Sequence, residues 1–179
     1  GALRLADFFA ECLTADRINS DDFRVECATV DVPTLLRDAI EHARFIPTTH
    51  ALLVDAPAVP PLYADPTLLR VALQNLIANA LRYAPEGSTI TVRAYAGVTG
   101  VIFAIEDEGP GITVAEAAQI VRKYRRGQSS QGKPGAGLGL AIVQRIAELH
   151  GGVLRITPGT RDGSVFVLEI PLGNPQHGD

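Results

Sequence analysis

Two pairs of alternating segments, each preceded by an apolar helical pattern, restrict the fold of this chain most strongly. Alternating apolar and polar residues on both sides of a short turn are the pattern of a β-hairpin, and apolar residues at helical spacing predict a helix before each hairpin. Because helices are followed by hairpins and not by single strands, the order favours an α+β layered fold over a doubly wound parallel sheet. The hairpins are expected at residues 89–96 with 101–107 and 153–157 with 164–170, and the preceding helices at 67–83 and 138–150.

The rest of the chain carries further helix signals and one strand pattern. Asp31 with Pro33, and the Asp-Pro pair at 65–66, place a capping residue and a proline at two helix starts. Thr113 and Glu116 have the spacing of a capping box. The expected elements are an amphipathic helical segment at 3–13, a strand at 23–29, a helix from 31 to about 44, a proline-rich connection at 55–66 and a helix from 113 to about 124.

The composition is that of one ordinary globular domain. The 179 residues are 46% hydrophobic and 20% charged, which is enough for a single core. The net charge is −4 and no long basic run is present, which argues against nucleic-acid binding. No apolar run approaches the roughly 20 residues of a membrane-spanning helix. Cys12 and Cys27 show no metal-ligand spacing, so they are expected to be two reduced thiols.

A glycine-rich stretch at 127–143, GQSSQGKPGAGLGLAIV, shares features with two known nucleotide-binding loops. Its first seven residues match the G-x-x-x-x-G-K start of a P-loop, but Pro134 follows where that loop needs a hydroxyl, and no buried strand precedes it. The dinucleotide pattern G-x-G-x-x-G/A fails because the sixth residue from Gly135 is Leu140. Both interpretations are therefore disfavoured.

A third interpretation of the same stretch is a lid that folds over phosphates. Basic residues are concentrated beside these glycines, which suggests an anionic ligand. Backbone N–H groups and the positive end of the following helix, at 138–140, would face that anion. From this stretch alone, a surface loop that caps the next helix remains an equal alternative. The basic residues are Arg122, Lys123, Arg125, Arg126 and Lys133.

Polar side chains form a stripe on the otherwise apolar helix expected at 67–83. Asn75, Asn79 and Arg82 are spaced i, i+4 and i+7, so two amides and a guanidinium share one face. A solvated helix face explains any one of these residues. Two asparagines in one row, with leucine and isoleucine around them, make a solvated face a weaker explanation.

The segment IEDEGPGI at 105–112 ends a predicted strand with a carboxylate. Gly109 and Gly111 follow Asp107 at alternate positions, which lets a ligand ring approach the backbone closely. The carboxylate can accept a hydrogen bond from an exocyclic amine, and adenine has one. An ordinary turn after a strand is the alternative.

Four motifs in the right order are more specific than any one of them. The motifs N-L-x-x-N-A (75–80), D-x-G-x-G (107–111), G-x-G-L-G-L-A (135–141) and G-S-V-F-V-L (163–168) resemble those of the catalytic ATP-binding domain of sensor histidine kinases, in the gyrase, heat-shock chaperone, histidine kinase and MutL superfamily. The resemblance covers about residues 23–172. It implies an α+β fold of the Bergerat type: a two-layer α/β sandwich with a mixed, mostly antiparallel sheet, helices on one face and a mobile ATP lid.

The resemblance also implies a role for each motif residue. Asn79 would be the main Mg²⁺ ligand, with Asn75 in support, and Arg82 would contact phosphate. These three are the expected catalytic residues. Tyr83 would pack on adenine, and Asp107 would accept a hydrogen bond from its amine. Further ATP-binding residues would be Gly109, Gly111 and Ile112 at the base and Lys133, Gly135, Gly137, Leu138, Gly139 and Leu140 at the phosphates.

Phosphoryl transfer to histidine is the activity that the resemblance implies. Relatives that hydrolyse ATP carry a glutamate four residues before the metal-binding asparagine, whereas this chain has Asn75, which cannot take a proton from water. A neutral imidazole needs no such base. The family's acceptor lies in an H-E-x-x-x-P-L type motif, so we expect it outside this chain, on a dimerisation hairpin. Those neighbours are missing around His42, His50, His150 and His177.

The same resemblance implies the organisation and the partners. Residues 1–22 would be the tail of the dimerisation helix with a linker, 23–174 the catalytic domain and 175–179 a polar tail. The partners would be the histidine-containing dimerisation domain of the same protein, in a homodimer, and the receiver domain of a response regulator. The domain would be cytoplasmic, whether or not the full-length protein is anchored in a membrane.

One segment departs from the family pattern. Residues 120–127 read I-V-R-K-Y-R-R-G, with Val121, Tyr124 and Arg125 at the positions that are usually aromatic. A lid with fewer aromatic contacts would bind ATP more weakly. This segment keeps open a nucleotide-binding module without catalysis. A separate alternative is the related serine kinase of the anti-sigma factor type, although the lid sequence looks like that of sensor kinases.

Overall fold

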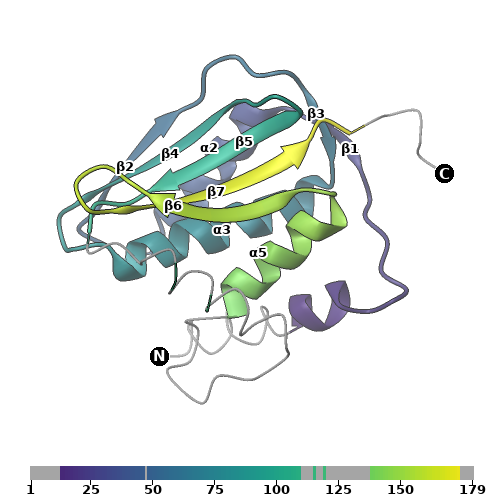
Figure 1. The fold of residues 1–179 in the computed structure, drawn as a ribbon, viewed down its shortest axis with the longest axis horizontal. Helices are drawn as coiled ribbons and strands as arrows, with labels where there is room; N and C mark the ends of the chain where they lie inside the picture. Colours follow the sequence, from purple (N-terminus) through teal and green to yellow (C-terminus); the bar gives the residue numbers. More distant parts are fainter. Residues whose placement is uncertain (1–12, 47, 110–114, 116–118, 120–137, 174–179) are drawn as a thin grey trace.

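The computed structural model describes residues 13–46, 48–109, 115, 119 and 138–173, apart from the side chain of Leu138. Within this part of the chain, three helices lie on one face of a five-stranded sheet (Figure 1). None of the helices found among the described residues is both long enough and apolar enough to cross a membrane. The three helices are α2 (Val32–Ala43), α3 (Pro66–Tyr83) and α5 (Leu138–Leu149).

The five strands are arranged in the order β2-β4-β5-β7-β6. β2 runs parallel to β4, and every other neighbouring pair is antiparallel. This mixed, mostly antiparallel sheet with helices on one face confirms the two-layer α+β fold expected from the sequence. The strands are β2 (Ala51–Asp55), β4 (Thr89–Ala96), β5 (Gly100–Glu106), β6 (Val153–Pro158) and β7 (Ser164–Pro171), and β1 (Ala28–Val30) and β3 (Leu62–Ala64) form a separate antiparallel pair.

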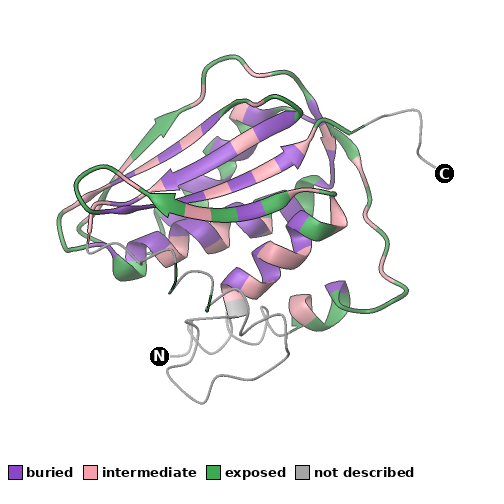
Figure 2. Ribbon diagram, in the orientation of Figure 1, coloured by how far each residue is buried: buried purple, intermediate pink, exposed green. Residues whose placement is uncertain are grey.

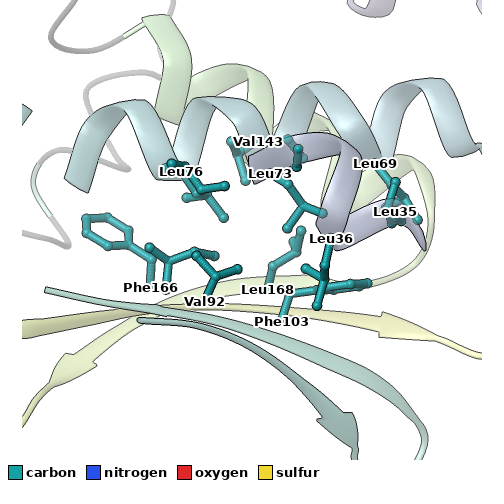
Figure 3. Packing of buried hydrophobic residues seen from close by; sticks show 14 of the residues in the cluster. Leu35, Leu36, Leu69, Leu73, Leu76, Val92, Phe103, Val143, Phe166 and Leu168 are labelled. Carbon is teal, nitrogen blue, oxygen red and sulfur yellow. The ribbon is translucent and has the colours of Figure 1, made fainter. Parts of the chain in front are cut away.

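An apolar core lies between the helices and the sheet. Phe103, Phe166 and Leu168 point from β5 and β7 towards Leu73 and Leu76 of α3 (Figure 3). All five side chains are at most 1% exposed. Burial alternates along the whole of β7 (Figure 2), as expected for a strand with one face in the core. Burying apolar area stabilises the fold by about 25 cal/mol per Å², so these contacts hold α3 firmly on the sheet.

Both helix starts with an Asp cap and a proline are confirmed. The Asp31 carboxylate accepts from the backbone N–H of Thr34 at 3.2 Å. Asp65 Oδ1 accepts from the N–H groups of Thr67 and Leu68, both at 3.1 Å. Each helix also has a proline in its first turn, where a missing N–H breaks no helical bond. The caps determine where α2 and α3 begin, and thereby where the polar stripe of α3 lies along the sheet.

The structure differs from the expected strands at two places. β2 (Ala51–Asp55) was not expected, because an edge strand with mostly exposed residues has no alternating pattern to detect. The strand expected at 23–29 is limited to β1 (Ala28–Val30). The backbone N–H of Glu26 instead donates to the Asp65 carboxylate at 2.9 Å, so this stretch is held by the cap of α3 and not by a neighbouring strand.

Part of the segment before residue 23 packs with the same core. Ile18 is 1% exposed, and its carbonyl accepts from Arg145 Nε of α5 at 3.0 Å. The expected domain boundary at residue 23 stays a prediction. The helical segment expected at 3–13 and the helix expected at 113–124 lie almost entirely outside the described residues.

His150 joins the end of α5 to the start of α3. Its Nε2 accepts from the backbone N–H of Asp65 at 3.0 Å, and its Nδ1–H donates to the Ile146 carbonyl at 2.7 Å. These two bonds together require a neutral ring with the proton on Nδ1. The imidazole therefore links the N-cap residue of α3, Asp65, to the last turn of α5. We call this pair of bonds the His150 clamp.

Replacing His150 with alanine is expected to lower the free energy of unfolding by about 2 kcal/mol, because the N–H of the buried Asp65 loses its acceptor. Urea denaturation of the parent and the variant measures this difference. His42, exposed on α2, supplies the control, and His42→Ala should change stability by less than about 0.5 kcal/mol. Equal stabilities of the two variants would contradict the clamp.

Candidate functional site

The polar stripe on α3 lies between the buried and the exposed sides of the helix. Asn75 and Asn79 are half-buried and Arg82 is exposed, whereas Leu73 and Leu76 are fully buried. The helical spacing therefore places two amides and a guanidinium on one side of α3, next to the side that packs in the apolar core.

Asn75 is held on α3 and faces the first turn of α5. Its Nδ2 donates to the Val71 carbonyl one turn earlier, at 2.8 Å. Its Oδ1 lies against Gly139, where an added Cβ would be only 2.8 Å from this oxygen. The absence of a side chain at 139 permits this approach. The structure thus brings together the asparagine motif and the end of the glycine-rich stretch.

The start of α5 adds backbone donors at this contact. The first N–H groups of an α-helix have no partner within the helix, and this end carries partial positive charge. α5 begins at Leu138, and Leu140, which is 5% exposed, anchors its first turn in the core. The N–H groups in this turn are therefore suited to an anion such as phosphate.

Asp107 is buried directly after β5 and is 7% exposed. Its backbone N–H donates to the Ser164 carbonyl at 3.0 Å, and its Oδ1 accepts from the Ser164 N–H at 3.1 Å. Burial raises the pKa of the Asp107 carboxyl above its ordinary value; the Ser164 N–H opposes this shift, and the negative charge of Glu106 adds to it. Asp107 is therefore a buried acceptor whose orientation depends on β7.

Gly163 makes the contact between β7 and Asp107 possible. A Cβ at this position would be 1.8 Å from the Asp107 carbonyl oxygen, which no side chain can occupy. The motif at 163–168 predicted a final strand, but it predicted no role for Gly163 or Ser164. The signal that could have identified them is a glycine followed by a serine at the start of a strand that pairs with β5, the strand before the D-x-G segment.

The residues after Asp107 meet the end of α3. A Cβ on Gly109 would be 2.8 Å from Cδ of Pro85, so the D-x-G backbone lies directly against the residues that follow α3. Tyr83, the last residue of the helix, is 48% exposed. The aromatic ring is therefore present at the same end of α3 as the carboxylate segment.

Three segments far apart in the sequence converge along α3 (Figure 1). Asn75 contacts the start of α5, and Pro85 contacts the segment after β5.

A surface hollow of about 380 Å³ beside His50 and Leu52 includes none of the motif residues. Outside the described residues lie Gly111, Ile112, Lys133, Gly135 and Gly137, the side chain of Leu138, and the segment 120–127.

The donor atoms near α3 fit magnesium only when a phosphate completes the coordination. Among the described residues, no group of three or more His, Cys, Asp or Glu side chains could hold a metal ion. Mg²⁺ commonly takes one or two protein oxygens and completes its octahedron with phosphate oxygens and water. The amide oxygens of Asn75 and Asn79 fit that type of site.

Comparisons with known proteins found similarity to sensor histidine kinases. The sensor-like histidine kinase SenX3 of Mycobacterium tuberculosis (strain H37Rv) is 33% identical over 176 residues, which cover 95% of this chain and 42% of SenX3. The sensor protein BasS of Escherichia coli K12 is 41% identical over 115 residues, or 62% of this chain and 31% of BasS. Full-length ShkA, solved in complex with AMPPNP, superimposes with a TM-score of 0.76 at 29% identity, over 95% of this chain and 36% of ShkA. This chain thus spans less than half the length of these relatives.

A protein-family model also matches this chain. The model described as histidine kinase-, DNA gyrase B- and HSP90-like ATPase matches residues 64–174, which is more than half of the chain. The matched range includes α3, the segment after β5, the start of α5 and β7. These are the elements whose contacts define the candidate site. The chain therefore belongs to the histidine kinase-, DNA gyrase B- and HSP90-like ATPase family.

Proposed function

We propose that this chain is the ATP-binding catalytic domain of a two-component sensor histidine kinase and transfers the γ-phosphoryl group of ATP to a histidine outside residues 1–179. The observation that carries the proposal is the convergence on α3, with Asn75 against Gly139 and Gly109 against Pro85. Such an arrangement would hold the base, the cation and the phosphates of one nucleotide. The sensor histidine kinases among the relatives support the same activity.

Asn79 would bind Mg²⁺, and Asn75 would support it. The bond from Asn75 Nδ2 to Val71 directs the Asn75 oxygen towards the start of α5, where the phosphates would lie. Arg82 would contact a phosphate from the exposed end of the stripe. When bound, Mg²⁺ would neutralise the charge of the phosphate oxygens. The three side chains would thereby orient the transferred group.

Asp107 and Tyr83 would bind adenine. The Ser164 N–H engages Oδ1 of Asp107, so Oδ2 would accept from the adenine amine. Tyr83 is half exposed and would pack its ring on the base. The base pocket would be completed by Gly109, Gly111 and Ile112.

The glycine-rich stretch would close over the phosphates as an ATP lid. Backbone N–H groups at the start of α5 would donate to phosphate oxygens, and Lys133 would add a positive charge. Glycines close to the phosphates would permit backbone approach without a side chain between. The proposed phosphate-binding residues in this stretch are Lys133, Gly135, Gly137, Leu138, Gly139 and Leu140.

Asn75 also favours transfer to histidine over hydrolysis, because an amide cannot take a proton from water. Two histidines of this chain have structural roles. His50 Nε2–H donates to the Ala84 carbonyl at 3.0 Å, and both nitrogens of His150 are hydrogen-bonded. As in the sensor histidine kinases that the chain resembles, the phosphoryl acceptor would be a histidine on a dimerisation hairpin.

The proposed partners follow from this activity. They are the histidine-containing dimerisation domain of the same protein, in a homodimer, and the receiver domain of a response regulator. Residues 1–22 would form the tail of the dimerisation helix with a linker, 23–174 the catalytic domain and 175–179 a polar tail. The catalytic domain would act in the cytoplasm.

A phosphotransfer assay tests the proposal. The chain is incubated with Mg²⁺ and γ-labelled ATP, together with a separately supplied dimerisation hairpin. Acid-labile label on the hairpin histidine is expected, and a hairpin with that histidine replaced by glutamine should stay unlabelled. Label on serine would favour a serine kinase, tight ATP binding without transfer would favour a nucleotide-binding module, and failure to bind Mg-ATP would refute the nucleotide site itself.

Asp107→Asn is expected to weaken Mg-ATP binding about tenfold and to change Mg-GTP binding less than about twofold. If the asparagine oxygen stays on the Ser164 N–H, an NH2 group takes the place of Oδ2 and meets the adenine amine, so two donors face each other. Isothermal titration calorimetry with each nucleotide measures the selectivity. Asp38→Asn on the exposed side of α2 is the control and should behave as the parent. If Asp107→Asn prefers Mg-ATP over Mg-GTP as strongly as the parent does, Asp107 does not bind the adenine base.

A further inference from the structure

Glu106, the residue before Asp107, holds the turn between β6 and β7. Its Oε2 accepts from Arg93 Nη1 of β4 at 2.8 Å. Its Oε1 accepts from both the hydroxyl (2.6 Å) and the backbone N–H (3.0 Å) of Thr160. Because successive side chains of a strand alternate between its faces, Glu106 lies on the sheet face opposite to Asp107. Its side chain is nevertheless only 13% exposed.

These contacts keep Glu106 ionised. The Thr160 hydroxyl, the Thr160 N–H and Arg93 together hold the pKa of the Glu106 carboxyl below its ordinary value, against the effect of burial. Hydrogen bonds to an ionised acceptor are stronger than those between neutral groups. The carboxylate is therefore a firm anchor for the turn.

The turn that contains Thr160 has two non-glycine residues in an unfavourable backbone region, so a side-chain contact that holds it is important. Arg161 and Asp162 have φ angles of +53° and +60°, and the Gly163 N–H donates to the Thr160 carbonyl at 3.1 Å. This is the geometry of a two-residue hairpin turn with both central residues in the left-handed region. The Gly159 N–H donates to the Gly163 carbonyl, so residues 159 and 160 together oppose Gly163 and form a bulge. The bulge directs Thr160 towards the sheet.

The same turn leads into β7, whose first residue contacts Asp107. Ser164 fixes Asp107 Oδ1, and Gly163 lies against the Asp107 carbonyl. Arg161 Nη1 also approaches Glu108 Oε1 at 3.6 Å, but its side chain is 81% exposed, so this pair contributes little. The position of Ser164 therefore depends on the anchored side of the turn as well as on its strand pairing with Pro158.

From this geometry we infer that Glu106 is a positioning residue for adenine recognition. By holding Thr160 it fixes the turn between β6 and β7, and the turn fixes the Asp107 carboxylate that accepts from the base. Arg93 holds Glu106 from the neighbouring strand. The inference rests on the proposed nucleotide site and adds to it residues that do not touch the nucleotide.

Glu169 provides a matched control on the same sheet. It also accepts from an arginine, Arg155 Nη2 at 2.9 Å, and from a threonine hydroxyl, that of Thr99 at 3.4 Å. In the strand register it is opposite Ile102 of β5 and not at the Asp107 end. Removing Glu169 therefore breaks the same kinds of bond without releasing the turn.

The test compares Glu106→Ala, Glu106→Gln and Glu169→Ala by calorimetry with Mg-ATP and Mg-GTP. Glu106→Ala should weaken Mg-ATP binding about tenfold and change Mg-GTP binding less than about twofold, because only the interaction with the base is misplaced. Glu106→Gln keeps an oxygen that accepts from Thr160, so it should bind Mg-ATP within about threefold of the parent. Glu169→Ala should bind both nucleotides as the parent does. In the free proteins, hydrogen exchange of the Ser164 amide should be faster only in Glu106→Ala.

The outcomes separate this inference from the proposed function. A parent chain that does not bind Mg-ATP overturns both. A parent that binds, with Glu106→Ala unchanged in affinity and in preference for ATP, overturns only the positioning role. Equal losses for both nucleotides in Glu106→Ala and Glu169→Ala would also overturn it, because they would reflect a general weakening of the sheet.

Discussion

Asn79→Ala is expected to abolish Mg²⁺-dependent ATP binding, with a loss of affinity of at least about 100-fold. The amide oxygen of Asn79 is the proposed ligand of the cation, and the described residues hold no cluster of acidic, histidine or cysteine side chains to replace it. Calorimetry with Mg-ATP, repeated after chelation of the metal, measures the effect. The parent should lose affinity when Mg²⁺ is removed, whereas the variant should bind weakly under both conditions.

Gln74→Ala is the matched control for this variant. Gln74 is a half-buried amide on α3 next to Asn75, but it lies off the polar stripe. Its removal should leave Mg-ATP binding unchanged. Circular dichroism should show the same helix content in both variants, which separates loss of the ligand from loss of the fold. Parent-like binding by Asn79→Ala would mean that another group holds the cation.

Gly163→Ala is expected to lower the free energy of unfolding by about 3 kcal/mol and to remove most of the affinity for ATP. The new Cβ would be 1.8 Å from the Asp107 carbonyl oxygen and 2.8 Å from its carbonyl carbon, so the backbone of β5 or β7 must move. That movement breaks the bonds between Asp107 and Ser164 on which the orientation of the carboxylate depends. Urea denaturation gives the stability, and calorimetry gives the affinity.

Gly97→Ala, in the turn between β4 and β5, is the control for adding a methyl group to a hairpin. Its Cβ would be 2.9 Å from Cδ1 of Ile102, the far end of a flexible side chain that can move away. The expected cost is below about 1 kcal/mol, and ATP binding should not change. Equal effects of the two substitutions would show that the close approach of Gly163 to Asp107 is not important.

Local signals in the sequence predicted most of the fold. α3 was expected at 67–83 and is observed at Pro66–Tyr83, because its cap, its proline and its apolar spacing all act within a few residues. Both hairpins were predicted for the same reason. β2 was missed because it lies at the edge of the sheet and buries little, so its sequence is not required to alternate.

The sequence predicted the motif residues of the candidate site, but it did not predict the residues that hold them in place. The polar stripe of α3 and a carboxylate at the end of a strand, Asp107, were both expected, and their roles in binding ATP stay predictions. Gly163, Ser164 and Glu106 were missed. Their importance arises from the pairing of β5 with β7, and the spacing of residues along one segment does not contain that information.

The sequence by itself determined the helices, the hairpins and the order of the motifs, because caps, periodicity and turns depend on interactions within a few neighbouring residues. Only the tertiary structure decided that Asn75 faces Gly139, that Ser164 engages one oxygen of Asp107 and that Thr160 is held by Glu106. These contacts join residues far apart in the chain. Their geometry depends on strand register and on how the shared core places α3 and α5 over the sheet, which are properties of the whole packed domain.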